Sequence, residues 1–122
     1  MYKCLVVGSR TIFDYNLTKK HLDFLLQGKD DVEIVSGGAN GVDKLAKRYA
    51  VEHNLKYKEF PALWHKHGRS AGYKRNIQMH EYISQFPNRI CVAFWDGASK
   101  GTQHSFDLSK QYNNEIVIVK EA

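Results

Sequence analysis

The stretch EIVSGGANGVDKLA, residues 33–46, contains the pattern that decides the fold. Glu33–Val35 is a short apolar-centred run of the kind that forms a strand. A glycine-rich segment follows at 36–41, and from Val42 onward apolar residues recur at i, i+3, i+4, i+7 and i+8, which is typical of an amphipathic helix. The stretch therefore predicts a strand, a glycine loop and a helix in succession.

The same alternation runs along the whole chain. Short apolar or alternating runs predict strands near 4–7, 33–35, 57–60, 90–95 and 116–119. Amphipathic stretches predict helices near 17–26, 42–52, 68–85 and 102–112. Strict alternation with short connections favours a parallel sheet covered by helices on both faces. We predict a Rossmann-like three-layer α/β/α fold with a five-stranded parallel sheet in the order 3-2-1-4-5.

Length and composition set the broad class. The 122 residues predict one domain, 1–122, and no apolar run is long enough for a membrane helix. Cys4 and Cys91 lie in strand-like runs, where buried reduced thiols are expected, so we expect a cytoplasmic protein. The net charge of +5 suits a phosphate-bearing partner, although many basic domains are merely soluble.

Three strand-to-helix loops carry the candidate chemistry. They are Gly8–Arg10, Ser36–Asp43 and Asp96–Thr102, and in a parallel sheet all three lie at the carboxyl edge, where ligands bind. Glycine permits close backbone approach, and the start of the following helix attracts phosphate. None of the loops is a standard dinucleotide or Walker fingerprint. No metal-binding motif stands out, and we expect neither a metal nor a cofactor.

The helix predicted at 68–85 places two polar groups on the side that faces the sheet. Arg75 and Asn76 lie in its first turns, which should point into the ligand crevice. An inward arginine needs an anionic partner. That partner is either a ligand phosphate or a carboxylate of the protein, Asp43 or Asp96. Trp64 and Trp95 are either stacking surfaces for a base or packing residues.

Five motifs occur in order over nearly the whole chain: VVGSR at 6–10, VSGGANGVDKLA at 35–46, FPALW at 60–64, AGYKRNIQM at 71–79 and AFWDGASKGT at 93–102. Together they resemble the YspA-like branch of the SLOG superfamily, the SMF/DprA–LOG group. The resemblance implies a Rossmann-like fold that binds nucleotides or nucleotide-derived ligands. Members of the superfamily include phosphoribohydrolases, DNA-binding DprA proteins, and sensors or processors of nucleotide signals.

One departure bears on catalysis. The phosphoribohydrolases combine an Arg-Lys-x-x-Met-like helix with a glycine loop that carries a glutamate. Arg75–Met79 looks like that helix and Gly101-Thr102 looks like that loop, but we place the glutamate position at His104. The candidates for an acid–base group are therefore Asp43, Asp96 and His104.

The leading hypothesis is a protein that binds a nucleotide or nucleotide-derived small molecule, as a sensor or processor of nucleotide signals. The alternatives are a nucleotide-directed hydrolase, either an N-glycosidase or a phosphohydrolase, and a DNA-binding protein of the DprA type. The lysines and arginines are spread over several elements, which disfavours nucleic acid. The resemblance also raises the expectation of a homodimer. The predicted ligand-binding residues are Gly8, Ser9, Arg10, Gly37, Gly38, Ala39, Gly41, Asp43, Arg75, Asn76, Asp96, Gly97, Ser99, Gly101 and Thr102.

Overall fold

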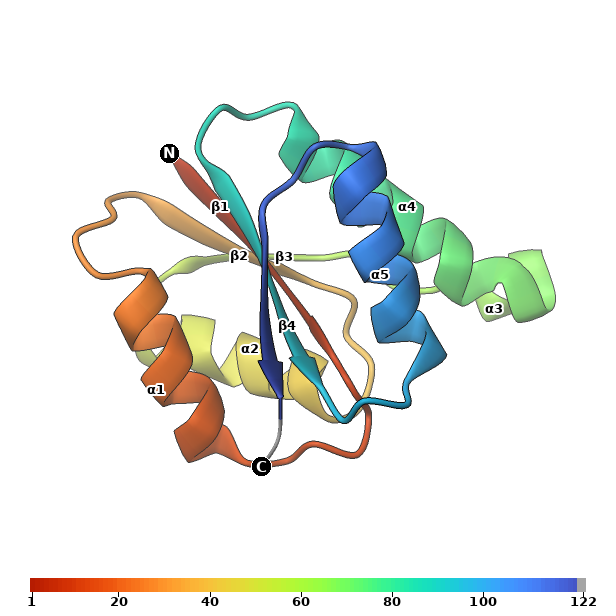
Figure 1. The fold of residues 1–122 in the computed structure, drawn as a ribbon, viewed down its shortest axis with the longest axis horizontal. Helices are drawn as coiled ribbons and strands as arrows, with labels where there is room; N and C mark the ends of the chain where they lie inside the picture. Colours follow the sequence, from red (N-terminus) through yellow and green to blue (C-terminus); the bar gives the residue numbers. More distant parts are fainter. Residues whose placement is uncertain (121–122) are drawn as a thin grey trace.

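A five-stranded parallel sheet forms the centre of the computed structural model, which describes residues 1–120 (Figure 1). Its strands lie in the order β3-β2-β1-β4-β5, and all four neighbouring pairs are parallel. This confirms the predicted fold class and strand order. The strands are β1 (Tyr2–Gly8), β2 (Val32–Ser36), β3 (Lys56–Glu59), β4 (Arg89–Trp95) and β5 (Ile116–Lys120).

Two helices cover each face of the sheet. α1 (Tyr15–Leu25) and α2 (Val42–Glu52) pack on one face, and α4 (Ala71–Ser84) and α5 (Lys100–Gln111) pack on the other (Figure 1). The helix predicted from residue 68 differs at its start. A short helix α3 (Trp64–His67) and a 3-10 turn (Gly68–Ser70) precede α4, and Gly68 has a φ of +57°. An α-helix has negative φ, so Gly68 lies outside the helix, which begins at Ala71.

The core has two halves because successive strand residues point to opposite faces. Cys4, Val6 and Ile34 pack under α1 and α2, whereas Leu5 and Cys91 belong to the other half. Both cysteines are buried and free, as predicted, and their positions in different halves keep the two thiols apart. No helix of residues 1–120 is long and apolar enough to cross a membrane.

The strand order reverses between β1 and β4, which lie side by side with Gly8 opposite Phe94. This adjacency brings the loops after the two strands together. The Asp96 amide donates to Ser9 Oγ at 3.0 Å, and Thr11 Oγ1 donates to the Asp96 carboxylate at 3.1 Å. The reversal therefore forms the crevice in which α/β proteins of this kind bind ligands.

Candidate functional site

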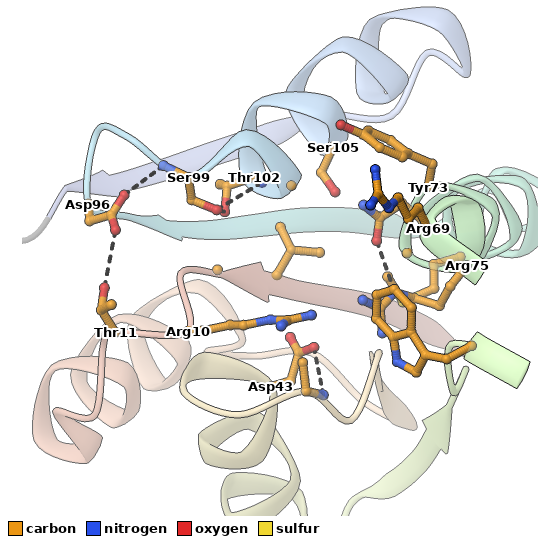
Figure 2. Close-up of a pocket in the computed structure, with 18 residues that line it drawn as sticks. Arg10, Thr11, Asp43, Arg69, Tyr73, Arg75, Asp96, Ser99, Thr102 and Ser105 are labelled. Carbon is orange, nitrogen blue, oxygen red and sulfur yellow. Dashed lines mark hydrogen bonds between the residues drawn. The ribbon is translucent and has the colours of Figure 1, made fainter. Parts of the chain in front are cut away.

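A cavity of about 390 Å³ opens at the carboxyl edge of the sheet, over β1 and beside α4 and α5 (Figure 2). Ten of the fifteen predicted ligand-binding residues line it: Gly8, Arg10, Ala39, Asp43, Arg75, Asn76, Asp96, Ser99, Gly101 and Thr102. Gly37 and Gly38 line an adjoining cavity instead. Ser9, Gly41 and Gly97 line neither of the two. The three predicted loops thus meet around one hollow, although not every residue in them faces it.

The space beside the loop between β2 and α2 is occupied by other groups of the protein. The Ala39 amide donates to the Asp43 carboxylate at 3.1 Å. A Cβ on Gly37 would collide with the Arg75 guanidinium, and a Cβ on Gly41, whose φ is +78°, would lie 2.6 Å from the carbonyl oxygens of Ser9 and Arg10. Packing within the protein, rather than the approach of a ligand, accounts for glycine at these two positions.

Arg75 extends from α4 toward this loop and is almost completely buried. Its Nη1 donates to the Gly37 carbonyl at 2.8 Å, and its Nε donates to Asn76 Oδ1 at 3.0 Å. The Asp43 carboxylate lies near enough to influence the pKa of the Arg75 guanidinium. The two groups form no ion pair, because no pair within 4.0 Å among residues 1–120 includes Arg75. Burial lowers the pKa of Arg75, while the charge of Asp43 acts in the opposite direction. Arg75 therefore braces the loop and still lines the cavity.

The loop between β4 and α5 presents a different surface. Asp96 accepts hydrogen bonds from the amides of Ala98 and Ser99, at 2.8 and 2.9 Å, and these bonds lower the pKa of its carboxyl group. Ser99 caps α5 by accepting from the Thr102 amide. Within residues 1–120 the amides of Lys100 and Gly101 have no acceptor, as expected in the first turn of a helix. A Cβ on Gly101 would meet no atom within 4 Å.

The three candidate acid–base groups differ in position. Asp43 is buried and lines the cavity, and burial raises the pKa of its carboxyl group to about 6, against the opposing charge of Arg75. Asp96 also lines the cavity but is held ionised by its amide donors. His104 does not line it; its Nδ1 lies 3.4 Å from Asn76 Nδ2, and its ring packs edge-on against Tyr73. Of the three, Asp43 has the environment of an acid–base group.

Sequence reasoning missed four polar residues of the cavity: Thr11, Arg69, Tyr73 and Ser105 (Figure 2). Ser105 is the neighbour of His104 in α5, is 1% exposed, and its hydroxyl has no hydrogen-bond partner in the described chain. A sheet-facing helical periodicity through Thr102 and Ser105 was the signal that would have identified it.

The two tryptophans differ in role. Trp64 lines the cavity and is half exposed, whereas Trp95 donates its indole N–H to the Ser99 carbonyl and serves packing.

Three arginines and two aspartates give the polar lining a small excess of positive charge. Arg10, Arg69 and Arg75 reach the cavity from different elements, and none takes part in an ion pair within residues 1–120. The carboxylates of the lining are Asp43 and Asp96. The arrangement suits an anionic guest that several arginines contact at once.

The chain is similar in sequence to one known protein and in fold to two others. The Gene 61 protein of Mycobacterium phage D29 is 34% identical over 110 residues, which cover 85% of each chain. The DNA processing protein A (DprA) of Helicobacter pylori has a similar fold over 99% of this chain, with a TM-score of 0.71 at 19% identity. DprA of Streptococcus pneumoniae matches 100% of this chain, with a TM-score of 0.64 at 16% identity. This chain spans 66% and 51% of those two proteins, and at such identities the likeness is one of fold. The YAcAr family model matches residues 2–67, and the chain therefore belongs to the YspA, cpYpsA-related SLOG family.

Proposed function

We propose that the protein binds a nucleotide or a nucleotide-derived small molecule in the cavity at the carboxyl edge of the sheet, as a sensor or processor of nucleotide signals. The observation that carries this proposal is the set of Arg10, Arg69 and Arg75, three arginines without carboxylate partners in residues 1–120 that line one cavity. A phosphate group satisfies such arginines through charge-assisted hydrogen bonds.

The other residues that line the cavity suit the phosphate, base and ribose of a nucleotide. The free amides of Lys100 and Gly101 and the positive end of α5 suit a phosphate oxygen. Trp64 and Tyr73 are both about half exposed beside the cavity and offer flat surfaces for a base. Asp43 offers a carboxyl group to a ribose hydroxyl.

A second candidate function is hydrolysis of the bound nucleotide. It rests on Asp43, whose pKa of about 6 lets the carboxyl group exchange a proton near neutral pH. Incubation with nucleoside monophosphates, followed by chromatography, separates the two functions. Release of base or sugar phosphate over many turnovers identifies an N-glycosidase, and release of inorganic phosphate identifies a phosphohydrolase.

A third candidate is nucleic-acid binding, because DprA of Helicobacter pylori, which shares the fold, has a single-stranded DNA binding mode. Titration with a short single strand at low and at physiological salt tests it. Binding through several phosphates weakens steeply as salt increases, whereas a ligand held in one cavity is less sensitive.

The decisive experiment for the main proposal compares Arg10→Ala with the wild-type protein in calorimetric titrations with a panel of nucleoside mono- and diphosphates. Arg10 is exposed and has no ion-pair partner in the described residues, so the melting temperature should stay unchanged. Loss of a charged hydrogen bond should weaken binding by about 1.5–3 kcal/mol, or roughly tenfold to more than a hundredfold. Lys20→Ala, which removes the same charge from the exposed side of α1, is the matched control. Absence of binding to every nucleotide, or equal affinity of Arg10→Ala and wild type, contradicts the proposal.

A further inference from the structure

A second cavity adjoins the first one on the β3 side of the sheet. It also has a volume of about 390 Å³, and it lies between the loop at 37–40 and the segment that follows β3. We call it the outer chamber and the cavity of Figure 2 the inner chamber. Four residues line both chambers: Arg10, Ala39, Trp64 and Arg75. The two chambers therefore meet along a shared wall.

Positive charge is concentrated on that wall. Arg10 comes from the loop after β1 and Arg75 from α4, and their side chains reach the centre of the site from opposite sides (Figure 2). Burial lowers the pKa of Arg75, the charge of Asp43 opposes that shift, and the nearby charge of Arg10 adds to it. Asp43 lies near both guanidinium groups, but neither arginine forms an ion pair within 4.0 Å in the described residues, so both can donate to an anion held between them. The boundary of the two chambers is thus a place for phosphate.

The outer chamber has its own recognition groups. Asn40, Lys44 and Glu59 provide polar side chains, and Gly37 and Gly38 bring backbone groups to its surface. Pro61, Ala62 and Trp64 provide an apolar side. A nucleoside combines a flat ring with polar edges and hydroxyl groups, and it matches such a lining.

Each chamber taken alone is near the lower end of the range of roughly 300–1,000 Å³ found for small-molecule sites. A mononucleotide in the inner chamber would leave the outer one without a guest. We infer that the ligand consists of two nucleoside units joined through phosphate, with one unit in each chamber and the linking phosphate between Arg10 and Arg75. This inference rests on the proposed function and specifies its ligand class.

The test compares AMP and GMP with diadenosine and diguanosine diphosphate by calorimetric titration. We expect a dinucleotide to bind the wild-type protein at least tenfold more tightly than the mononucleotide with the same base. Ala62→Phe fills the outer chamber from its rim and should reduce dinucleotide affinity to the mononucleotide level, without changing mononucleotide affinity. Gln111→Phe adds the same aromatic ring at the opposite edge of the sheet and should change neither affinity.

A second variant covers the case in which Ala62→Phe does not fold. Lys44 lies on the exposed side of α2 and lines the outer but not the inner chamber, so Lys44→Ala should reduce the dinucleotide preference alone. A further titration with an eight-nucleotide deoxyadenylate strand tests whether the two linked nucleosides belong to a free dinucleotide or to a longer strand. Affinity equal to that of the dinucleotide indicates a free dinucleotide, and a further gain with length indicates a strand.

The outcomes separate the two proposals. If mononucleotides bind as tightly as dinucleotides, and neither variant discriminates between them, the two-chamber ligand is wrong while the proposed function stands. If no mononucleotide, dinucleotide or strand binds at all, the proposed function fails and the two-chamber ligand fails with it.

Discussion

The loops at 37–41 and at 96–102 carry similar sequence features and have different physical roles. Both are glycine-containing loops that follow a strand and open a helix at the same edge of the sheet. In the first, the Ala39 amide is bonded to Asp43 and the Gly37 carbonyl to Arg75. In the second, the amides of Lys100 and Gly101 are free within residues 1–120, and the space around Gly101 is open. A glycine in such a loop therefore indicates that another group comes close to the backbone. It does not indicate whether that group belongs to a ligand or to the protein itself.

The largest expected effect concerns Gly41. Its positive φ costs a side chain about 1–3 kcal/mol, and overpacking against the Ser9 and Arg10 carbonyls costs about 1–3 kcal/mol more. We expect Gly41→Ala to destabilise the protein by about 2–6 kcal/mol in chemical denaturation. The matched variant Gly101→Ala should leave stability within about 1 kcal/mol of wild type, because its Cβ meets open space in the first turn of α5. Equal losses in the two variants would remove the distinction between the loops.

Arg75→Ala should show the next largest effect. It leaves the buried Gly37 carbonyl without its donor, and hydrogen bonds to charged groups contribute about 1.5–3 kcal/mol. We expect a loss of about 2–3 kcal/mol in ligand-free unfolding, together with weaker nucleotide binding. Arg75→Lys should recover part of the charge but not both hydrogen bonds. Unchanged stability of Arg75→Ala would mean that the arginine does not brace the first loop.

Asp43 makes the first loop sensitive to pH. Burial raises its pKa in the folded protein to about 6, above the unfolded value of 3.8, so the folded state binds more protons between these values. The contribution of Asp43 to stability is therefore present below about pH 4 and is lost as pH rises through 6. We expect Asp43→Asn to be more stable than wild type at pH 8, by about 1–3 kcal/mol, and to show no such advantage at about pH 4. A constant difference across this range, measured by denaturant titration, would rule out a raised pKa.

The smallest effect is expected at Ser105, which belongs to the second loop's helix. Its hydroxyl is buried without a partner in the described chain, and such a group costs about 1–3 kcal/mol in the ligand-free protein. Ser105→Ala should therefore leave stability unchanged or raise it by about 1 kcal/mol, and it should weaken nucleotide binding by about 1 kcal/mol if the ligand supplies the missing partner. Thermal melting and titration of the same variant measure both quantities. A clear loss of stability would indicate a structural partner for the hydroxyl.

The sheet, the strand order and the edge at which the loops meet all follow from patterns in the sequence. Strand and helix periodicities and glycine punctuation are local properties, and the handedness of the crossovers then leaves few topologies. The same reasoning placed Arg75 and Asn76 toward the crevice, because the face of a helix follows from its apolar stripe.

Which polar groups at that edge remain unbonded depends on contacts between residues far apart in the chain. Whether the Gly37 carbonyl is bonded depends on Arg75, 38 residues away, and no local pattern shows such a contact. Ser105 lines the cavity and its neighbour His104 does not, because each helical residue turns the side chain by about 100° and the docking of α5 fixes that rotation. The adjoining chamber likewise arises where the loop after β2 meets the segment after β3, and this meeting exists only in the folded chain.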